Sequence, residues 1–345
     1  MTITTNRTLL ASALDRCARV TPSRTTKPIL AHTLLVAAEG RLTYRATNLQ
    51  CEASGSLPAV GSGSICVSPK ELASALAGLT GDTVTLSPAA GHVSVTGSTK
   101  RSFKLATLDA DDFPAPMAVD GSTHELPAET LSGLIASVAF AARQDADRHE
   151  QHCVHLEPWK GQLRATTADG GRRVATRDIA LASDIRLNIP LPVANMIAGI
   201  KSGTVTLTCD SRGMAFQHGD ERLAAMIPVA DFPPINSHLD MLPRGASVTL
   251  AAEQLLESVK ALWRVDPEQD VRLSFTSGLI VVECTGKGSA RDEIECPVVT
   301  PYEVWLPADQ LSDALGAVSG DVTLSYGPAE LDPFWIAQSG WQTLM

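Results

Sequence analysis

The sequence predicts an α+β fold in which three similar units follow one another, each with two helices on an antiparallel sheet. Two series of helix-like segments recur at intervals of roughly 120 residues. Segments of alternating apolar and polar residues fill the stretches between them. With 345 residues, the chain is also longer than a single hydrophobic core usually supports. We therefore expect a repeated architecture.

The first series consists of amphipathic segments that open each unit. They span residues 7–20, 129–143 and 253–265. Their aligned leucines, Leu9, Leu131 and Leu255, are 122 and 124 residues apart. In the first two segments, apolar side chains keep the i, i+3, i+4, i+7 spacing that places them on one face of a helix. Each unit is thus expected to begin with a helix that buries one side.

The second series lies halfway along each unit, at residues 67–87, 189–209 and 306–326. In each segment a proline precedes a helix-like stretch, a glycine-containing turn follows, and a Val-Thr-Leu strand begins 15 residues after the proline. These prolines are Pro69, Pro190 and Pro307, which are 121 and 117 residues apart. Two independent series with nearly one period predict three tandem copies of one structural unit.

Alternating segments such as HVSVTG (92–97) and QLRATT (162–167) predict strands of antiparallel hairpins. The tripeptide Asp-Phe-Pro occurs at 112–114 and again at 231–233, close to the ends of the first two units. We place the domains at residues 1–121, 122–243 and 244–345, with both boundaries at proline-rich exits.

Composition excludes several classes of protein. Apolar residues make up 44% and charged residues 19%, which is typical of a globular chain. The net charge of −10 argues against a uniformly basic nucleic-acid binder, although one basic face remains possible. Seven scattered cysteines without a CxxC spacing favour a reducing compartment, and no apolar run is long enough to span a membrane. We expect a cytoplasmic protein without an export signal.

Five segments together resemble the β subunit of bacterial DNA polymerase III, the sliding clamp. They are SRTTKPIL (23–30), LTYRATNL (42–49), FAARQDADR (140–148), TTADGGRRVA (166–175) and both Asp-Phe-Pro turns. No single segment is specific, but their order along nearly the whole chain is. The resemblance implies three clamp-type (DNA clamp) domains that form a half-ring.

The same resemblance implies a function. Two chains would pair head to tail into a closed ring that encircles duplex DNA and tethers the polymerase as a processivity factor. Sheets would form the outside and helices the lining. Expected partners are double-stranded DNA, a second copy of the chain, the DNA polymerase III α subunit, the clamp loader and other proteins with a clamp-binding motif. The clamp itself would need no cofactor and would be no enzyme.

A protein that travels along DNA should contact phosphates and avoid base edges. The resemblance and the helix faces give nine candidate DNA contacts: Arg16, Arg19, Arg24, Lys27, Arg143, Gln144, Arg148, Lys260 and Arg264. A solvated helix face, with Glu257 pairing to Lys260, is the competing interpretation. Because these basic residues are few, we expect weak and strongly salt-dependent attraction to DNA.

The resemblance also implies an apolar groove between the second and third domains that binds partner peptides. Its residues would be Asp169, Gly170, Arg172, Arg173, Val174, Pro233, Thr343 and Met345. Polar residues occupy several other groove positions, and the Pro and basic residue that close the family's last strand have no counterpart after WQTLM. We expect lower affinity for peptides, since polar walls lose apolar burial.

Phe113, Val265, Glu293 and Glu295 are the candidates for the dimer interface implied by the resemblance. Asp266 and Pro267 stand where apolar residues would be expected, which predicts weaker ring closure.

Three alternatives to this interpretation arise from the sequence. The cluster His149, His152, Cys153 and His155 could bind zinc, but it runs from a loop into a strand, so we expect no metal site. The sequence has no Walker, GxSxG or HExxH motif, which argues against an enzyme. A paralogue with the clamp fold that acts as a scaffold or decoy, without conferring processivity, is the serious competing hypothesis.

Overall fold

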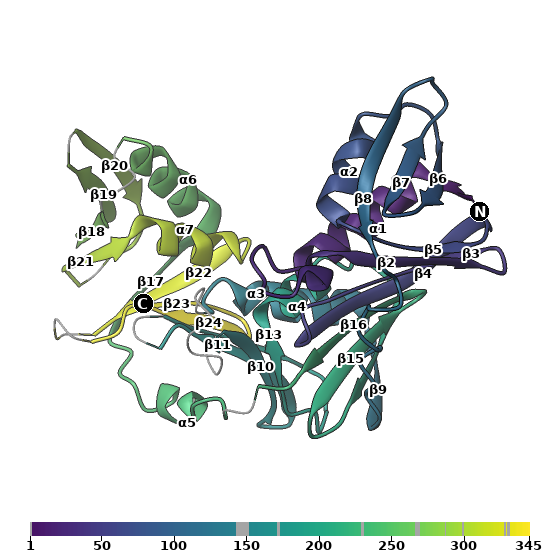
Figure 1. The fold of residues 1–345 in the computed structure, drawn as a ribbon. Coiled ribbons are helices and arrows are strands. Elements are labelled where there is room, and N and C mark those ends of the chain that lie inside the picture. Colours follow the sequence, from purple (N-terminus) through teal and green to yellow (C-terminus); the bar gives the residue numbers. More distant parts are fainter. Residues whose placement is uncertain are drawn as a thin grey trace. The chain divides into compact units, whose positions relative to one another are not determined.

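The fold repeats one topological pattern, a strand, a helix and three strands, six times along the chain (Figure 1). The structure is a computed structural model that describes residues 2–142, 152–170, 173–228, 231–265, 270–286, 288–298, 300–327, 329 and 332–345. Two consecutive patterns correspond to one predicted unit. The α+β class and the series of paired helices are therefore confirmed.

The first two patterns comprise β1 (Ile3–Asn6), α1 (Arg7–Val20), β2 (Thr33–Ala38), β3 (Arg41–Thr47), β4 (Cys51–Gly61), β5 (Gly63–Val67), α2 (Pro69–Ala77), β6 (Thr83–Ala89), β7 (His92–Thr96) and β8 (Ser102–Leu108). The next two comprise β9 (Ser122–Pro127), α3 (Ala128–Ala139), β10 (Cys153–Trp159), β11 (Gln162–Ala168), β12 (Val174–Ile179), β13 (Leu187–Pro190), α4 (Leu191–Ile197), β14 (Thr204–Cys209), β15 (Gly213–His218) and β16 (Glu221–Met226). The last two comprise β17 (Ala246–Ala251), α6 (Ala252–Trp263), β18 (Asp270–Thr276), β19 (Leu279–Thr285), β20 (Ser289–Glu295), β21 (Tyr302–Pro307), α7 (Ala308–Gly316), β22 (Asp321–Tyr326), β23 (Trp335–Gln338) and β24 (Trp341–Leu344). A short 3-10 helix (Pro28–Ala31) and α5 (Ile235–Leu239) lie outside the pattern.

Strand pairing inside each unit follows one rule. The strand before the first helix pairs with the first strand after the second helix, as in β1–β6, β9–β14 and β17–β22. The strand before the second helix pairs with the first strand after the first helix, as in β2–β5, β10–β13 and β18–β21. All these pairs are antiparallel. Each unit is therefore built from two similar halves.

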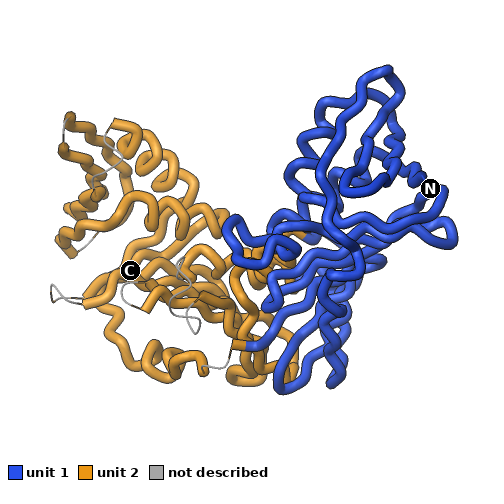
Figure 2. The backbone as a smooth tube through the Cα atoms, in the orientation of Figure 1, with its two compact units in different colours: residues 1–130, 200–227 blue, residues 131–199, 228–345 orange. Residues whose placement is uncertain are grey.

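Two compact units divide the chain differently (Figure 2). Unit 1 contains residues 1–130 and 200–227, and unit 2 contains residues 131–199 and 228–345. The division cuts through the middle repeat, so the predicted boundaries after residues 121 and 243 stay a prediction.

Each compact unit contains one sheet that joins strands of two repeats. In unit 1, β4 pairs antiparallel with β16, from Cys51 opposite Ala225 to Gly55 opposite Glu221. In unit 2, β12 pairs antiparallel with β24, from Val174 opposite Leu344 to Arg177 opposite Trp341. We call these pairings the first and second junctions.

Helix α1 shows why the repeated segments fold as they do. The side chain of Asn6 accepts hydrogen bonds of 3.0 Å from the backbone N–H groups of Thr8 and Leu9, which caps the helix start. Its apolar stripe, including Leu10 and Leu14, is fully buried in the core of unit 1. In unit 2, α6 and α7 bury the corresponding faces over β17–β22 and their neighbours. Among the described residues, no helix has the length and apolar character that crossing a membrane requires.

Candidate nucleic-acid and partner interfaces

The basic residues at the start of the chain differ in how exposed their side chains are and in whether they form ion pairs. Arg16 is half-buried, forms an ion pair with Glu221 and lies 6.0 Å from the Tyr44 ring. Arg19 pairs with Asp15 at 2.9 Å on the exposed face of α1. Arg24 and Lys27 are exposed in the loop after α1. Of the predicted contacts in unit 1, Arg24 and Lys27 therefore offer the most accessible charge.

In unit 2, Lys260 and Arg264 are exposed at the end of α6. Lys260 lines a hollow of about 400 Å³ together with Asp309 and Asp313 of α7. Burial raises the pKa of the Asp313 carboxyl above its usual value, while Arg173, 3.9 Å away, opposes this. These acids reduce the attraction of the α6 cations for phosphate. The predicted contacts Arg143, Gln144 and Arg148 lie outside the described residues.

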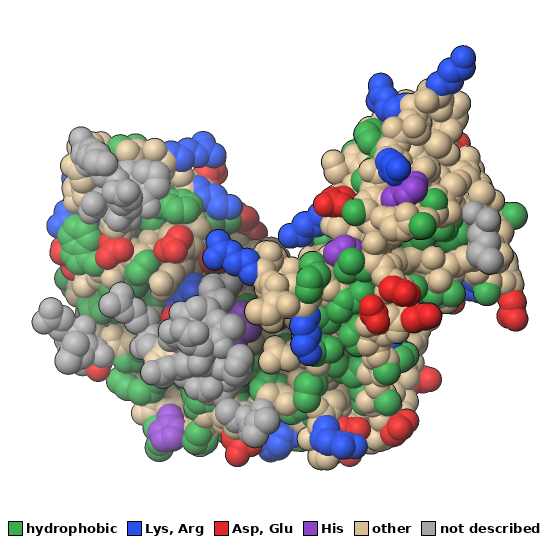
Figure 3. All heavy atoms as spheres, in the orientation of Figure 1, with side chains coloured by type: hydrophobic (Ala, Val, Ile, Leu, Met, Phe, Trp, Pro, Cys, Tyr) green, Lys and Arg blue, Asp and Glu red, His purple; other side chains and the backbone are tan. Residues whose placement is uncertain are grey.

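Basic and acidic side chains are interspersed over the face drawn in Figure 3. Among the described residues visible there, Lys and Arg form no continuous band on either unit.

The predicted partner groove starts at a tight turn between β11 and β12. Asp169 accepts hydrogen bonds from the backbone N–H of Arg173 at 2.9 Å and from its guanidinium at 3.4 Å. Gly170 lies in this turn with φ +81°, a conformation that favours glycine. Val174 opens β12 opposite Leu344, so the structure brings this part of the predicted set to the second junction. Arg172 lies outside the described residues.

Thr343 requires a correction. Its side chain is only 1% exposed, and its hydroxyl donates to the Val174 carbonyl at 2.9 Å. Thr343 therefore stabilises the strand pair from inside and does not form a groove wall. Met345 is partly exposed, with backbone hydrogen bonds in both directions to Phe334.

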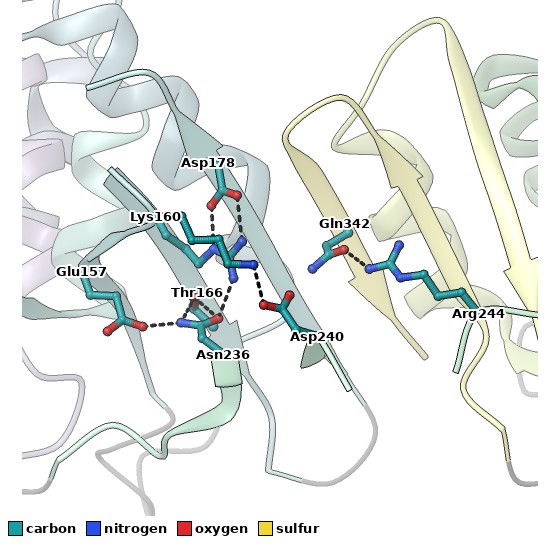
Figure 4. A network of polar contacts seen from close by, with 9 residues as sticks. Glu157, Lys160, Thr166, Asp178, Asn236, Asp240, Arg244 and Gln342 are labelled. Atoms are coloured by element: carbon teal, nitrogen blue, oxygen red, sulfur yellow. Dashed lines mark hydrogen bonds and ion pairs between the residues drawn. The ribbon is translucent and has the colours of Figure 1, made fainter. Parts of the chain in front are cut away.

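The segment after Pro233 is fixed to unit 2 by a polar network that the sequence analysis missed (Figure 4). Arg164 of β11 donates to both carboxylate oxygens of Asp178, at 2.6 and 2.7 Å, and its side chain is 6% exposed. Its third donor reaches the Asn236 side chain at 3.4 Å. Asn236 also bonds to Thr166 and Glu157. Each nitrogen of this buried guanidinium thus donates a hydrogen bond, and the Trp159 ring lies 4.7 Å from it.

His155 belongs to the same region. Its ring stacks on Phe232 of the second Asp-Phe-Pro at 4.7 Å, and its Nδ1 lies 2.6 Å from the Asn188 side-chain oxygen. Burial lowers the pKa of His155. Cys153 is buried, His149 lies outside the described residues, and among the described residues no group of three or more ligands could hold a metal ion.

The first junction has its own buried charges, also missed from sequence. Glu52 of β4, whose side chain is 2% exposed, lies 3.3 Å from Arg222 and 3.7 Å from Arg45. It also accepts the backbone N–H of Met117 at 3.1 Å. Burial raises the pKa of Glu52 and lowers that of Arg45. The tripeptide Arg-Ala-Thr, at 45–47 and again at 164–166, was an available signal for both networks.

Phe113 also requires a correction. It is 8% exposed and packs under the Arg45 guanidinium, 5.1 Å from it, inside unit 1. A buried side chain does not contribute to a subunit surface. The other three candidates for the dimer interface, Val265, Glu293 and Glu295, are exposed.

Two strand edges remain open where their counterparts are paired. The last strands of the second and third repeats, β16 and β24, pair with β4 and β12 of the preceding repeat. Among the described strands, β8 contacts β7 and only the last two residues of β5, and β20 pairs with β19 alone. The edge of β8 carries exposed Lys104, whereas β20 carries exposed Asp292, Glu293 and Glu295 together with one exposed cation, Arg291, which pairs with Glu293 at 2.7 Å.

Six strand-helix-strand patterns on shared sheets, joined by antiparallel junctions, define a clamp-type repeat protein. Over residues 1–117 the chain matches the family model described as DNA polymerase III beta subunit, N-terminal domain. It is 27% identical over 346 residues to a beta sliding clamp of Caulobacter vibrioides, covering 93% of this chain and 91% of that protein. A beta sliding clamp of Pseudomonas aeruginosa is 24% identical over 337 residues, covering 92% of this chain and 90% of that protein.

Solved structures show the same fold. The sliding clamp of Bartonella birtlesii superposes with a TM-score of 0.86 at 21% identity, covering 100% of this chain and 98% of that one. The DNA polymerase III beta subunit of Thermotoga maritima gives a TM-score of 0.86 at 20% identity and the same coverage. Over its first 117 residues the chain thus matches the family of DNA polymerase III β subunits, and over most of its length it is similar to beta sliding clamps.

Proposed function

We propose that this protein is a sliding clamp, a non-catalytic processivity factor of DNA replication that encircles duplex DNA as a head-to-tail homodimer. The observation that carries the proposal is the pair of open edges on β8 and β20. Among the described strands, neither has the partner that its equivalents in the other repeats have at the two junctions. The named relatives favour this function over a scaffold or decoy.

Subunit pairing would follow the rule of the two junctions. At each junction the last strand in the first half of one repeat pairs antiparallel with the last strand of the following repeat. Applied to the open edges, the rule pairs β20 of one copy with β8 of another. The acidic side chains of β20 would then face Lys104 and the neighbouring Arg101. Val265, Glu293 and Glu295 remain candidates for this contact, and β8 replaces Phe113.

DNA binding would be weak and independent of sequence. Exposed Arg24, Lys27, Lys260 and Arg264 are suited to phosphate contacts, and Asp309 and Asp313 oppose them nearby. Retention on DNA would thus depend on topology and only slightly on affinity. Such a protein stays on circular DNA and slides off the ends of linear DNA at the same salt concentration. Electrostatic binding alone would give equal retention on both forms.

Partner binding is proposed at the second junction, around the turn from Asp169 to Val174, Pro233 and Met345. The DNA polymerase III α subunit, the clamp loader and other proteins with a clamp-binding motif are the expected partners there. Because Thr343 is buried and polar residues surround the turn, we expect lower peptide affinity than in a fully apolar groove.

The decisive test is retention on DNA of two topologies. The protein is loaded onto nicked circles with a clamp loader from a related bacterium, and the circles are then linearised. A clamp remains on the circles at 0.2 M salt and dissociates after linearisation. Equal loss from both forms would contradict the proposal.

Assembly is tested separately by light scattering. Lys104→Glu should weaken the dimer about tenfold or more, because it places like charges at the interface, and adding Glu293→Lys should restore part of the affinity. Lys201→Glu makes the same charge change at an exposed site outside both edges and should have no effect. Equal loss of the dimer by Lys104→Glu and Lys201→Glu would point to net charge instead of the strand edges.

A further inference from the structure

A four-stranded sheet in unit 2 has helices on one face only. Its strands run in the order β20-β19-β18-β21, and α6 and α7 pack against one side (Figure 1). Side chains alternate along a strand, so the buried Leu273 and Phe275 of β18 point to the helices. Arg272 and Ser274 therefore point the opposite way, as does Trp305, which lies opposite Arg272 on β21. We call this second side the open face.

The open face carries more negative than positive charge. Strand register assigns five carboxylates to it, those of Asp270, Glu283, Glu293, Glu295 and Glu303. The same register assigns it two guanidinium groups, those of Arg272 and Arg291. Among the described residues, carboxylates therefore exceed guanidinium groups by three on this face. Such a face attracts cations and repels phosphate.

Trp305 exposes a large apolar ring at one edge of the open face. The residue is 49% exposed, and the Arg272 guanidinium lies 5.6 Å from the ring centre. Arg272 is in turn held by an ion pair with Glu283 and lies 3.6 Å from Glu303. The ring is thus held in place before a partner arrives, which lowers the entropy cost of binding. A tryptophan in such a position is typical of a binding hot spot.

Accessible carboxylates flank the ring. Glu303 stands two residues before Trp305 on β21, and Asp270 lies opposite Pro307, two residues after it. Both acidic side chains are exposed. Ser274 donates to Oε2 of Glu303 at 3.4 Å, whereas Oε1 makes no hydrogen bond with the described residues. An incoming cation would meet an aromatic ring and an available carboxylate oxygen together.

This part of the open face is separate from the proposed ring contact. Trp305 lies on β21, at the opposite edge of the sheet from β20. Three steps between neighbouring strands amount to about 14 Å.

We propose that the Trp305 edge of the open face is a docking surface for a basic segment of a partner protein. An arginine of the segment stacks on the exposed part of the Trp305 ring and pairs with Glu303, while Asp270 adds attraction at longer range. A guanidinium suits both contacts, because it is planar and keeps its charge when it stacks on an aromatic ring. The negative charge of the face disfavours nucleic acid as the occupant.

The experiment uses full-length protein labelled with 5-fluorotryptophan, which gives one ¹⁹F signal for each of its five tryptophans. Trp305→Phe and Trp341→Phe assign two of these signals, and Trp341 reports on the second junction. The probe is the capped peptide Gly-Ser-Leu-Arg-Leu-Ser-Gly, compared with its citrulline analogue, with spermine and with a DNA duplex. We expect a saturable shift at Trp305 but not at Trp341, with the citrulline peptide at least about fivefold weaker.

Matched variants locate the binding, which is measured by fluorescence anisotropy of a dye-labelled peptide. Trp305→Ser should weaken affinity at least about tenfold, and Glu303→Gln about threefold. Met241→Ser removes a 73% exposed apolar side chain elsewhere in unit 2, and Glu257→Gln removes an exposed carboxylate of α6, on the covered side of the sheet. Both controls should leave affinity unchanged. Circular dichroism checks that each variant is folded.

Several results would overturn the proposal. Equal binding of the arginine and citrulline peptides would remove the role of charge. Spermine binding as tightly as the peptide would make the surface a general cation site, and a DNA duplex that shifts the Trp305 signal would make nucleic acid the occupant. A Trp305 signal that moves on dilution of the dimer would identify a second copy of the chain. Shifts confined to Trp341, or no saturable shift at Trp305, would place the peptide elsewhere.

Discussion

At each junction a network of charged side chains holds an Asp-Phe-Pro segment against a sheet, but the buried charge has the opposite sign in the two networks. At the second junction a guanidinium is buried, Asp178 and Asn236 accept hydrogen bonds from its three nitrogens, and the Trp159 ring lies 4.7 Å away. At the first junction a carboxylate is buried, and the guanidinium of Arg45 beside it lacks a hydrogen bond at Nη1. The comparison shows that the repeated topology determines where the segment after each Asp-Phe-Pro contacts the sheet. The side chains that make this contact can differ between repeats.

The difference also predicts unequal energies. A buried ion pair stabilises a fold only when its geometry and hydrogen bonds offset the cost of desolvation. The bidentate pair of Arg164 and Asp178 meets this condition, whereas the pKa shifts of Glu52 and Arg45 both indicate that desolvation exceeds their attraction.

Asp178→Asn should have the largest effect. It leaves the guanidinium of Arg164 buried without an anionic partner, and we expect the free energy of unfolding of unit 2 to fall by about 2–4 kcal/mol. All five tryptophans lie in unit 2, so urea unfolding followed by tryptophan fluorescence measures it directly. A change below about 1 kcal/mol would remove the proposed difference between the junctions.

Glu52→Gln should change stability much less, by under about 1 kcal/mol at pH 7.5, because the ionised carboxylate gains little inside the fold. Since Gln still offers an oxygen to the Met117 N–H, the backbone contact survives. Hydrogen exchange of the β4 amides reports on unit 1, which has no tryptophan. A loss as large as that of Asp178→Asn would show that the first network is equally strong.

The smallest expected effect is a pH response of opposite sign at the two junctions. Glu52 has a raised pKa, so its contribution to stability is present below about pH 4.3 and is lost as pH rises through the higher folded pKa. His155 has a lowered pKa, so its contribution is present above about pH 6.5 and is lost as pH falls through the lower folded pKa. Exchange rates of β4 and β10 amides between pH 7.5 and 4.5, corrected for intrinsic rates, should shift in opposite directions. Glu52→Gln and His155→Gln should each abolish one response and leave the other.

Much of the fold could be predicted from sequence because its signals are local. Helix α1 begins at Arg7 and ends at Val20, as the spacing of apolar residues indicated. The prolines Pro69, Pro190 and Pro307 lie at the second helix of each repeat. The ends were less accurate, since α3 ends at Ala139 and α6 at Trp263, a few residues earlier than predicted.

The junctions were not predictable in the same way, because they join residues far apart in the chain. Glu52 and Arg222 are 170 positions apart, and either residue alone looks like an ordinary surface charge. Phe113 and Thr343 were assigned to surfaces from resemblance, whereas their burial depends on Arg45 and on the β12–β24 pairing. The tripeptides Arg-Ala-Thr and Asp-Phe-Pro recur with the same spacing. This shared spacing was the one sequence signal that could have connected the two junctions.

The exposed side chains on the open edges of β8 and β20 differ in the sign of their charge, and this difference affects how an oligomer could grow. Two acidic edges repel each other, as do two basic ones, so copies add only in one polar direction. Such a contact ends when the chain of copies closes on itself and otherwise extends into a filament. In the proposed assembly, the charges on the two edges would therefore also disfavour symmetric dimers in which two copies of the same edge pair.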